Sequence, residues 1–220
     1  YWGVSTIYVP AAEAMPKARA AARKALEIDP DLAEAHVSLA NIQAAYDWDW
    51  AGAERASQAA IQQMPNYANA HDWYGRFLTY MGRFEEAEAE YQRAQELDPL
   101  SPTIASWASY SLYQARRYDR AIEQARKALE LEPGFYPAHL SLGLAYERKG
   151  MPQKAIEEFE AAFQLSGRIP GLKLYLGHAF VGAGRKSEAV RILEEARRQA
   201  KQTHEHLSHR CPMSGLGPKG

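Results

Sequence analysis

Two stretches of this sequence contain residue types whose spacing could support chemistry. Residues 46–53 read YDWDWAGA, and Asp47 and Asp49 at their centre have the Asp-x-Asp spacing with which sugar transferases hold a metal-bound nucleotide. Residues 204–211 read HEHLSHRC, which gives the pattern H-x-H-x2-H-x-C. Imidazole and thiolate groups are zinc ligands, but a zinc finger takes its ligands from two paired segments, and no second segment is present here. We therefore predict no metal site in either stretch. For residues 46–53, the alternative to a metal-bound nucleotide site is an ordinary turn.

The usual catalytic motifs are absent from the sequence. It contains no nucleophile elbow (G-x-S-x-G), no metalloprotease helix (H-E-x-x-H), no phosphate-binding glycine loop and no dinucleotide-binding fingerprint. Cys211, the single cysteine, has no plausible oriented base beside it, only a segment rich in histidine without an apolar period. We therefore predict that the chain is not an enzyme and uses no cofactor.

The composition narrows the classes of partner. The 220 residues carry a formal net charge of −1, whereas nucleic-acid binding needs an excess of clustered Lys and Arg, so we predict no nucleic-acid partner. No apolar run approaches the roughly 20 residues of a membrane span, so we expect no membrane insertion and favour a cytoplasmic location. The sequence begins with Tyr1 rather than Met, which indicates a piece of a longer protein.

The elements that position these residues follow from an internal repeat. Small and helix-ending residues recur at a spacing of 35 once and then 34. Two alanine columns carry the register: Ala18, Ala53, Ala87, Ala121, Ala155 and Ala189, and then Ala25, Ala60, Ala94, Ala128, Ala162 and Ala196. A third column of small residues contains Ala40, Gly75, Ser109, Gly143 and Gly177, and prolines end the units at Pro30, Pro65, Pro99 and Pro133. A fixed period of this length is the signature of a repeat architecture.

The repeat resembles the tetratricopeptide repeat family, whose unit reads W-x2-L-G-x2-Y, then A-x3-F, then P. The best units are AHDWYGRFLTYMGRFEEAEAEYQRAQELDP at 70–99 and AHLSLGLAYERKGMPQKAIEEFEAAFQL at 138–165, although His replaces the first aromatic in several units. The apolar residues of each unit also follow two amphipathic helices, which need stacked neighbours to bury them. We therefore expect an all-α fold, a right-handed α-solenoid of stacked antiparallel helix pairs.

The register also predicts the boundaries of the units. Residues 1–32 hold a partial first repeat with only its second helix, at about 15–28. Full repeats are expected at 33–67, 68–101, 102–135, 136–169 and 170–201. The remaining residues, 202–220, lack an apolar period and are rich in Gly and Pro, so we expect an irregular tail there.

The same register assigns ordinary roles to most of the chemical candidates. Asp49 falls at the N-cap of a second helix, and Trp50 falls at the place of Phe84 and Tyr118, where we expect it to pack in the helix pair. The residue that lengthens this unit to 35 is expected at Asp47-Trp48. The histidines of one column, His36, His71 and His139, lie on different units, so a shared packing role is favoured over a metal site.

The resemblance implies a binding groove, because the first helices of tetratricopeptide arrays line the concave side and take up an extended or helical peptide. The residues expected in that groove are Asn41, Asp72, Trp73, Arg76, Tyr80, Trp107, Tyr110, Tyr113, Leu140, Leu144, Arg148 and His178. Trp73 and Trp107 could instead pack between units. The Lys and Asn pattern of the repeats that bind chaperone carboxylates is missing, so aromatic or aliphatic anchors, with an acid for Arg76, suit this groove better.

Two functions from different classes remain open at this stage. The favoured one is a non-catalytic scaffold that binds a peptide segment of a partner protein in the groove. The alternative is a structural element that forms homo-oligomers through its uncapped terminal repeats, within a larger signalling protein. The amino-acid sequences of the units also resemble the tetratricopeptide tails appended to bacterial signalling proteins.

Overall fold

The computed structural model describes residues 11–195, 197 and 198. The chain divides into two compact units, one ending at Leu131 and the other beginning at Glu132. The described residues form helices and the turns between them, with no strand in these ranges. The predicted all-α solenoid of antiparallel helix pairs is confirmed, and its two units are described separately below.

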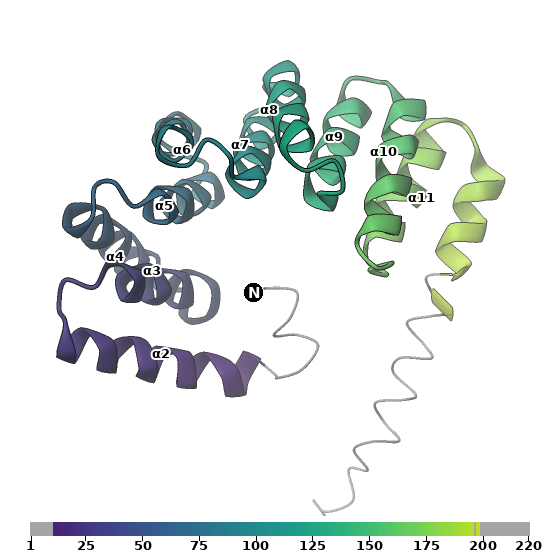
Figure 1. Ribbon diagram of the computed structural model, residues 1–220. Helices are drawn as coiled ribbons and strands as arrows, with labels where there is room; N and C mark the ends of the chain where they lie inside the picture. The colour runs from purple at the N-terminus through teal and green to yellow at the C-terminus, as the bar shows by residue number, and fades with distance from the viewer. Residues whose placement is uncertain (1–10, 196, 199–220) are drawn as a thin grey trace, which may run out of the picture. The chain divides into compact units, whose positions relative to one another are not determined.

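Residues 11–131 of the first unit form seven α-helices in the order that the repeat predicts. They are α2 (Ala11–Ile28), α3 (Ala33–Ile42), α4 (Trp50–Gln63), α5 (Ala68–Tyr80), α6 (Phe84–Leu97), α7 (Pro102–Gln114) and α8 (Tyr118–Leu131). Helices α3, α5 and α7 each pack against the helix that follows, and α5 also touches both α3 and α7 (Figure 1). The first helices of successive pairs therefore form one continuous layer.

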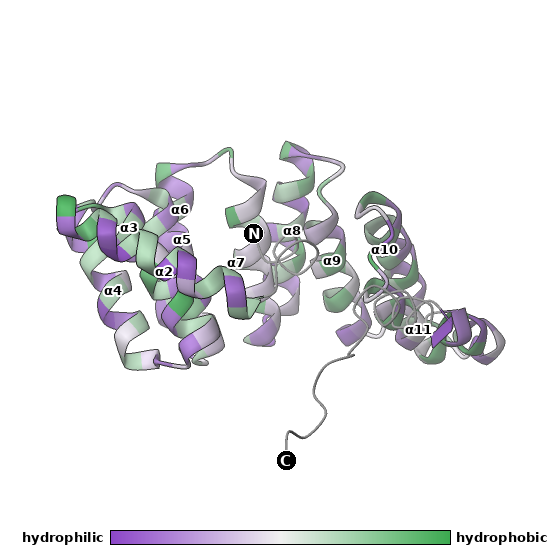
Figure 2. Cartoon of the chain, turned by 90° about the horizontal axis from the view of Figure 1, so that it is seen from below, coloured by the Kyte–Doolittle hydropathy of each residue, from purple (hydrophilic) through white to green (hydrophobic). Residues whose placement is uncertain are grey.

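The second unit repeats this arrangement. Its helices are α9 (Tyr136–Arg148), α10 (Pro152–Leu165) and α11 (Leu172–Gly182), and a further helix covers 186–195. Helix α10 packs against both α9 and α11. The helices carry hydrophilic and hydrophobic residues on different sides, as Figure 2 shows, because each must bury one stripe against its neighbours.

Small residues at the helix crossings let the pairs approach closely. Alanines of both columns are fully buried in the four central pairs: Ala53, Ala60, Ala87, Ala94, Ala121, Ala128, Ala155 and Ala162. Gly143 lies so close to Phe159 that a Cβ would stand 2.4 Å from its ring, and at Gly75 the ring of Tyr91 would be 3.0 Å away. In α2, by contrast, Ala18 is exposed and Ala25 half-buried.

Helix α2 begins earlier than the sequence indicated. Its first residue is Ala11 rather than Met15, and Pro16 lies inside it. Ala11, Ala12 and Glu13 favour a helix, and Pro16, the sixth residue, removes the one backbone hydrogen bond that its N–H would donate to the Ala12 carbonyl. These residues therefore extend the helix at its start.

The additional residue of the first full repeat lies in a π-helical turn, Gln43–Asp47, that continues α3. A π-turn adds one residue to a helical turn without ending the helix. Trp48 then adopts φ 58°, the left-handed conformation that ends the first helix in the other pairs at Gly82, Arg116, Gly150 and Gly184. The expected position of the insertion, at Asp47-Trp48, is therefore wrong: Trp48 occupies the regular place of Gly82.

Candidate functional site

A row of aromatic side chains lies on the layer of first helices in the first unit. This aromatic row consists of Trp73, Arg76 and Tyr80 on α5 and Trp107, Tyr110 and Tyr113 on α7. The Trp107 ring centroid lies 6.4 Å from that of Tyr80 and 5.8 Å from that of Tyr110, both edge to face. The Tyr110 and Tyr113 rings stack at 6.2 Å. The contacts join α5 to α7, so the row is continuous across two repeats.

The Arg76 side chain links the two tryptophans. Its guanidinium carbon lies 4.2 Å from the ring centre of Trp73 and 4.5 Å from that of Trp107, within the range of cation–π attraction. Both tryptophans are half-buried and pack against the core, Trp73 near Val37 and Ala70 and Trp107 near Phe77 and Ile104. They pack between repeats and also keep part of each ring at the surface.

Asp72 lies beneath this layer and pairs with Arg76. Only 2% of the Asp72 side chain and 11% of the Arg76 side chain are exposed. Burial raises the pKa of the Asp72 carboxyl, and the Arg76 charge opposes this shift. Because Asp72 is buried, it cannot contact a partner at the surface as the sequence suggested. Its carboxylate already occupies Arg76, so an acid supplied by a partner is not required.

Several buried polar groups lie on the helices that carry the row and on α6. The Thr79 hydroxyl donates to Ser111 Oγ at 2.9 Å and so joins α5 to α7. Within the described part of the chain, Asp72 Oδ1, Arg76 Nε and the Tyr91 hydroxyl lack hydrogen-bond partners. Burial raises the pKa of the Tyr91 hydroxyl, which therefore stays protonated. These neighbouring polar atoms make this the most polar part of the core under the row.

The remaining predicted groove residues lie on helices other than α5 and α7. Asn41 is half-buried on α3 in the first unit. The others belong to the second unit, where Leu144 is buried, Leu140 is half-buried and Arg148 is exposed on α9. His178 on α11 is exposed, with its Nδ1 2.7 Å from a carboxylate oxygen of Glu147 on α9.

One member of the ring contacts was missed by the sequence analysis. Tyr118, the first residue of α8, lies 6.0 Å from the Tyr113 ring and extends the row beyond α7. The register placed Tyr118 with Phe84 in the helix pair. The signal that could have indicated this contact is the five-residue spacing across a tight turn, which brings the ends of α7 and α8 together.

The Asp-x-Asp motif separates into two structural interactions. Asp47 pairs with Arg19 of α2, and Asp49 caps α4 by accepting a 2.8 Å hydrogen bond from the backbone N–H of Gly52. The predicted N-cap role of Asp49 is confirmed. Both carboxylates are occupied, so the motif has the properties of a turn rather than of a nucleotide site.

The expectation for Trp50 is wrong. Its side chain is 37% exposed and meets the 71% exposed Trp48 edge to face at 5.5 Å, rather than filling the helix pair. The equivalent residues Phe84 and Tyr118 are themselves only half-buried. The position that Trp50, Phe84 and Tyr118 share in the repeat is therefore not the core position that the register had suggested.

The histidine column has the shared packing role that its register predicted. In His36, His71 and His139, Nε2 lies 2.8, 3.0 and 3.1 Å from the carbonyl oxygen of the proline six residues earlier. Nδ1 of His71 and of His139 also lies 2.6 Å from a carboxylate 19 residues later, Glu90 or Glu158. The hydrogen bond to Glu90 raises the pKa of His71, with burial opposing it.

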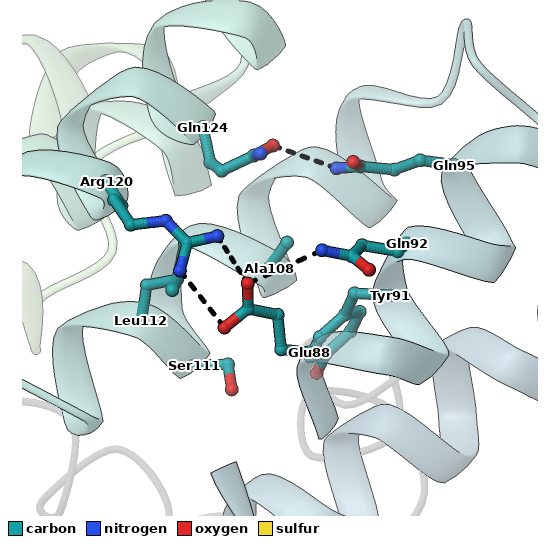
Figure 3. Close-up of a pocket in the computed structure, with 9 residues that line it drawn as sticks. All are labelled: Glu88, Tyr91, Gln92, Gln95, Ala108, Ser111, Leu112, Arg120 and Gln124. Carbon is teal, nitrogen blue, oxygen red and sulfur yellow. Dashed lines mark hydrogen bonds and ion pairs between the residues drawn. The ribbon is translucent and has the colours of Figure 1, made fainter. Parts of the chain in front are cut away.

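A small hollow lies between α6, α7 and α8 (Figure 3). It has a volume of about 30 Å³, room for one water molecule. Its polar groups hydrogen-bond one another: Arg120 pairs with Glu88, and Gln95 donates to Gln124 at 2.9 Å. A space of this volume leaves no place for a ligand of ordinary size.

Metal ligation is not indicated in the described ranges. No group of three or more His, Cys, Asp or Glu side chains there could hold a metal ion. The H-x-H-x2-H-x-C segment from His204 to Cys211 lies outside the described residues. None of the helices that the structure describes has the length and apolarity needed to cross a membrane.

Two family models match the chain, and both are described as tetratricopeptide repeat. One covers residues 49–106 and the other covers 108–168. Together they extend over more than half of the sequence and include every member of the aromatic row except Trp107, which lies between the two matched ranges.

Curated relatives and solved structures agree with these models. TPR repeat-containing protein YpiA of Bacillus subtilis is 27% identical over 128 residues, 58% of this chain and 30% of that protein. A tetratricopeptide repeat protein of Thermus thermophilus shares the fold with a TM-score of 0.68 at 20% identity, covering 79% of this chain and 94% of that one. YrrB, described as a TPR protein with an unusual peptide-binding site, gives a TM-score of 0.56 at 18% identity over 80% of this chain and 90% of its own. The chain spans less than a third of the length of the first curated relatives that it matches.

Proposed function

This chain belongs to the tetratricopeptide repeat family, and from that premise we propose that it is a non-catalytic scaffold that binds a peptide segment of a partner protein on the aromatic row. Proteins built from this repeat act as protein-interaction scaffolds. YrrB, a neighbour in fold, is described as having an unusual peptide-binding site. The observation that carries the proposal is the half-exposed, continuous row of Trp, Tyr and Arg side chains on α5 and α7.

The row has the chemistry of an interface centre. Trp, Tyr and Arg dominate the residues whose truncation weakens protein interfaces most. Tyr80 is 61% exposed, and the other members keep part of each side chain at the surface. The rings are fixed by their contacts with one another and with Arg76, so little side-chain entropy is lost when a partner covers them.

The binding residues of the proposal are those of the row, together with Asn41 on α3 and Asp72 as the buried support of Arg76. Leu140, Arg148 and His178 of the second unit stay predictions as contacts of a partner. Leu144 is omitted because it is buried.

The proposal is tested by selecting binders from a display library of random 12-residue peptides. The variant Y80S/Y110S/Y113S removes rings from the row and keeps the Asp72–Arg76 pair, whereas R76A would leave a buried carboxylate unpaired and unfold the site. The control is L100S, because Leu100 is 74% exposed and lies on the turn after α6, away from the row. We expect enriched peptides to bind the wild type and L100S but to lose at least about tenfold in affinity on the triple variant.

Circular dichroism is the control, and we expect equal helicity for all three proteins. Peptides that bind the triple variant as tightly as the wild type would contradict the proposal, because their site would then lie elsewhere. Failure to enrich any peptide on the wild type would contradict it as well.

Self-association is the second candidate function, and one observation favours it. The last described helices expose large apolar side chains: Leu174 57%, Val181 54%, Val190 55% and Leu193 44%. A second copy of the chain could cover them. Sedimentation of the wild type against V181S/V190S distinguishes the candidates: dimers lost in this variant and kept in Y80S/Y110S/Y113S would favour the terminal face.

The remaining expectations are part of the same proposal and stay predictions. They are the lack of catalysis, a protein rather than a nucleic-acid partner, and a cytoplasmic location.

A further inference from the structure

The helices that carry the aromatic row present no uncompensated charge. Helix α7, PTIASWASYSLYQ, contains no charged residue. Helix α5, ANAHDWYGRFLTY, contains Asp72 and Arg76, which pair with each other, and the buried His71, which faces Glu90. A partner that placed a carboxylate or an ammonium group here would lose hydration without gaining a free counter-charge. The occupant that suits this surface is therefore uncharged.

The spacing of the row along α7 matches one regular peptide conformation. Trp107 and Tyr113 are six residues apart, which corresponds to about 9 Å along the helix axis. A polyproline II helix completes one turn in three residues at about 3.1 Å each, so equivalent side chains also recur at about 9 Å. Tyr110 stands between them, perpendicular to the Trp107 ring. Six residues also turn by about 120° around an α-helix, so the row crosses α7 obliquely. A segment that follows this oblique row would meet Trp107 and Tyr113 with two prolines three residues apart, with Tyr110 between them.

The row also offers hydrogen-bond donors at its surface. No hydrogen bond joins the indole N–H of Trp73 or Trp107 to another residue in the described part of the chain, and neither atom is buried without a partner. A polyproline II segment makes no internal hydrogen bonds, so its carbonyl oxygens are free to accept from such donors. Aromatic grooves that recognise proline-rich segments use this combination of ring faces and donors.

Resting on the proposed function, we propose that the aromatic row binds an uncharged, proline-rich segment in the polyproline II conformation, and that Asp72 excludes acidic segments by neutralising Arg76. Asp72 is a specificity-determining residue in this arrangement. It touches no partner but decides whether the guanidinium between the two tryptophans presents a net charge.

The test uses isothermal titration of the full chain with three synthetic 12-residue peptides. The first is uncharged with prolines at every third position, the second replaces those prolines with alanine, and the third adds two glutamates to the first. For the wild type we expect the first peptide to bind best, with a loss of about tenfold or more for the alanine peptide and for the acidic one. Raising the salt from about 50 to about 500 mM should change the affinity for the first peptide by less than about twofold, because no exposed ion pair contributes.

The variant D72N keeps the shape and an acceptor for Arg76 but removes the carboxylate charge. It should bind the acidic peptide about tenfold more tightly than the wild type does, and that binding should weaken with salt. Unchanged discrimination in folded D72N would overturn the role of Asp72.

A peptide enriched from the display library serves as the reference and separates two kinds of failure. If that peptide binds the row and the proline peptide does not, or if the alanine peptide binds better, the polyproline inference is wrong and the proposed function stands. If the reference peptide itself binds the triple tyrosine variant as well as the wild type, the proposed function fails and the inference falls with it.

Discussion

Individual side chains in this chain repeat the same contact from unit to unit, and the histidine column shows why. Both ring nitrogens of His71 face oxygen acceptors, the Pro65 carbonyl and the Glu90 carboxylate. Two acceptors are satisfied together only by a doubly protonated imidazole. This arrangement ties the end of one repeat to both helices of the next.

The free energy of unfolding should depend on pH, because folding changes the pKa of His71. Because the folded state raises the pKa of His71 above the roughly 6.5 of an unfolded chain, it binds that proton more tightly. The resulting stabilisation is complete below about pH 6.5 and is lost as the pH rises through the folded pKa. We expect E90Q to lower the pKa of His71, measured by proton NMR titration of the ring, and to reduce the loss of stability on raising the pH. The control is H36Q. His36 has Arg55, not a carboxylate, 19 residues later, so it lacks the partner that Glu90 provides for His71. An equal effect of H36Q on the pH dependence would contradict this account.

Two residues adopt a left-handed conformation where most repeats have glycine. Trp48 has φ 58° and Arg116 has φ 60°, whereas Gly82, Gly150 and Gly184 occupy the same place elsewhere. A residue with a Cβ is strained there by about 1–2 kcal/mol. We expect R116G to stabilise the chain by about 0.5–1 kcal/mol, measured by denaturant unfolding, after the entropy that glycine loses on folding is subtracted.

The variant W48G should gain less. It removes the same strain but also the edge-to-face contact with Trp50, which is worth about 0.5–1.5 kcal/mol. A larger gain for W48G than for R116G would show that the tryptophan pair contributes nothing to stability.

The sequence predicted the roles of Asp49 and of the histidines because these contacts are local or repeat with the register. It failed for Trp50 because burial depends on the neighbouring turn, and Trp48 meets Trp50 outside the core. The pairing of Asp72 with Arg76 could have been recognised from their four-residue spacing on one helix. The tryptophans on either side of Arg76 come from two repeats, so their contact required the structure.

Helix pairing is governed by how closely two axes can approach, and the column of small residues sets that distance. The ring of Phe159 fills the space over Gly143, and Tyr91 fills the space over Gly75. At Gly177 the facing side chain is Leu193, whose methyl carbon would lie 3.3 Å from an added Cβ. The glycines of this column therefore differ in how much room an added methyl group would have.

This difference gives a graded prediction. An alanine in place of a helical glycine gains about 1 kcal/mol of helix propensity, while overpacking costs about 1–3 kcal/mol. We expect G143A to lower the free energy of unfolding by about 1–2 kcal/mol, because the aromatic ring above it cannot yield. G177A should be neutral or stabilising by up to about 1 kcal/mol, because Leu193 is 44% exposed and can rotate away. Denaturant unfolding measures both, and a reversed order would contradict the packing described.

Element order followed from the period of 34, since each unit carries its own amphipathic pattern and turn residues. The π-turn Gln43–Asp47 could not be predicted in this way. An extra residue anywhere between Ala40 and Ala53 leaves the register on either side unchanged. The start of α2 at Ala11 was missed because the residues before Met15 carry no apolar period that marks the first turn.

At the scale of the whole molecule, membership of a repeat family explains why the chain has helices, small residues and turns in these places but not what it binds. The family resemblance predicted that the first helices would carry the site. Within that layer, the structure joins the members on α5 and α7 into one row and leaves Leu144 and Asp72 buried. Which side chains meet across neighbouring repeats depends on rotamers and helix spacing, which the sequence pattern does not encode.

The five tryptophans of the chain allow the central claim, that a peptide binds on the aromatic row, to be tested directly. Each indole N–H gives one signal in a nitrogen–proton correlation spectrum, and those of Trp73 and Trp107 report on the row while those of Trp48 and Trp50 report on the turn before α4. On titration with a peptide enriched from the library, we predict that the signals of Trp73 and Trp107 shift and those of Trp48 and Trp50 stay in place. Binding that moves the Trp48 and Trp50 signals, or that leaves Trp73 and Trp107 unchanged, would contradict the account.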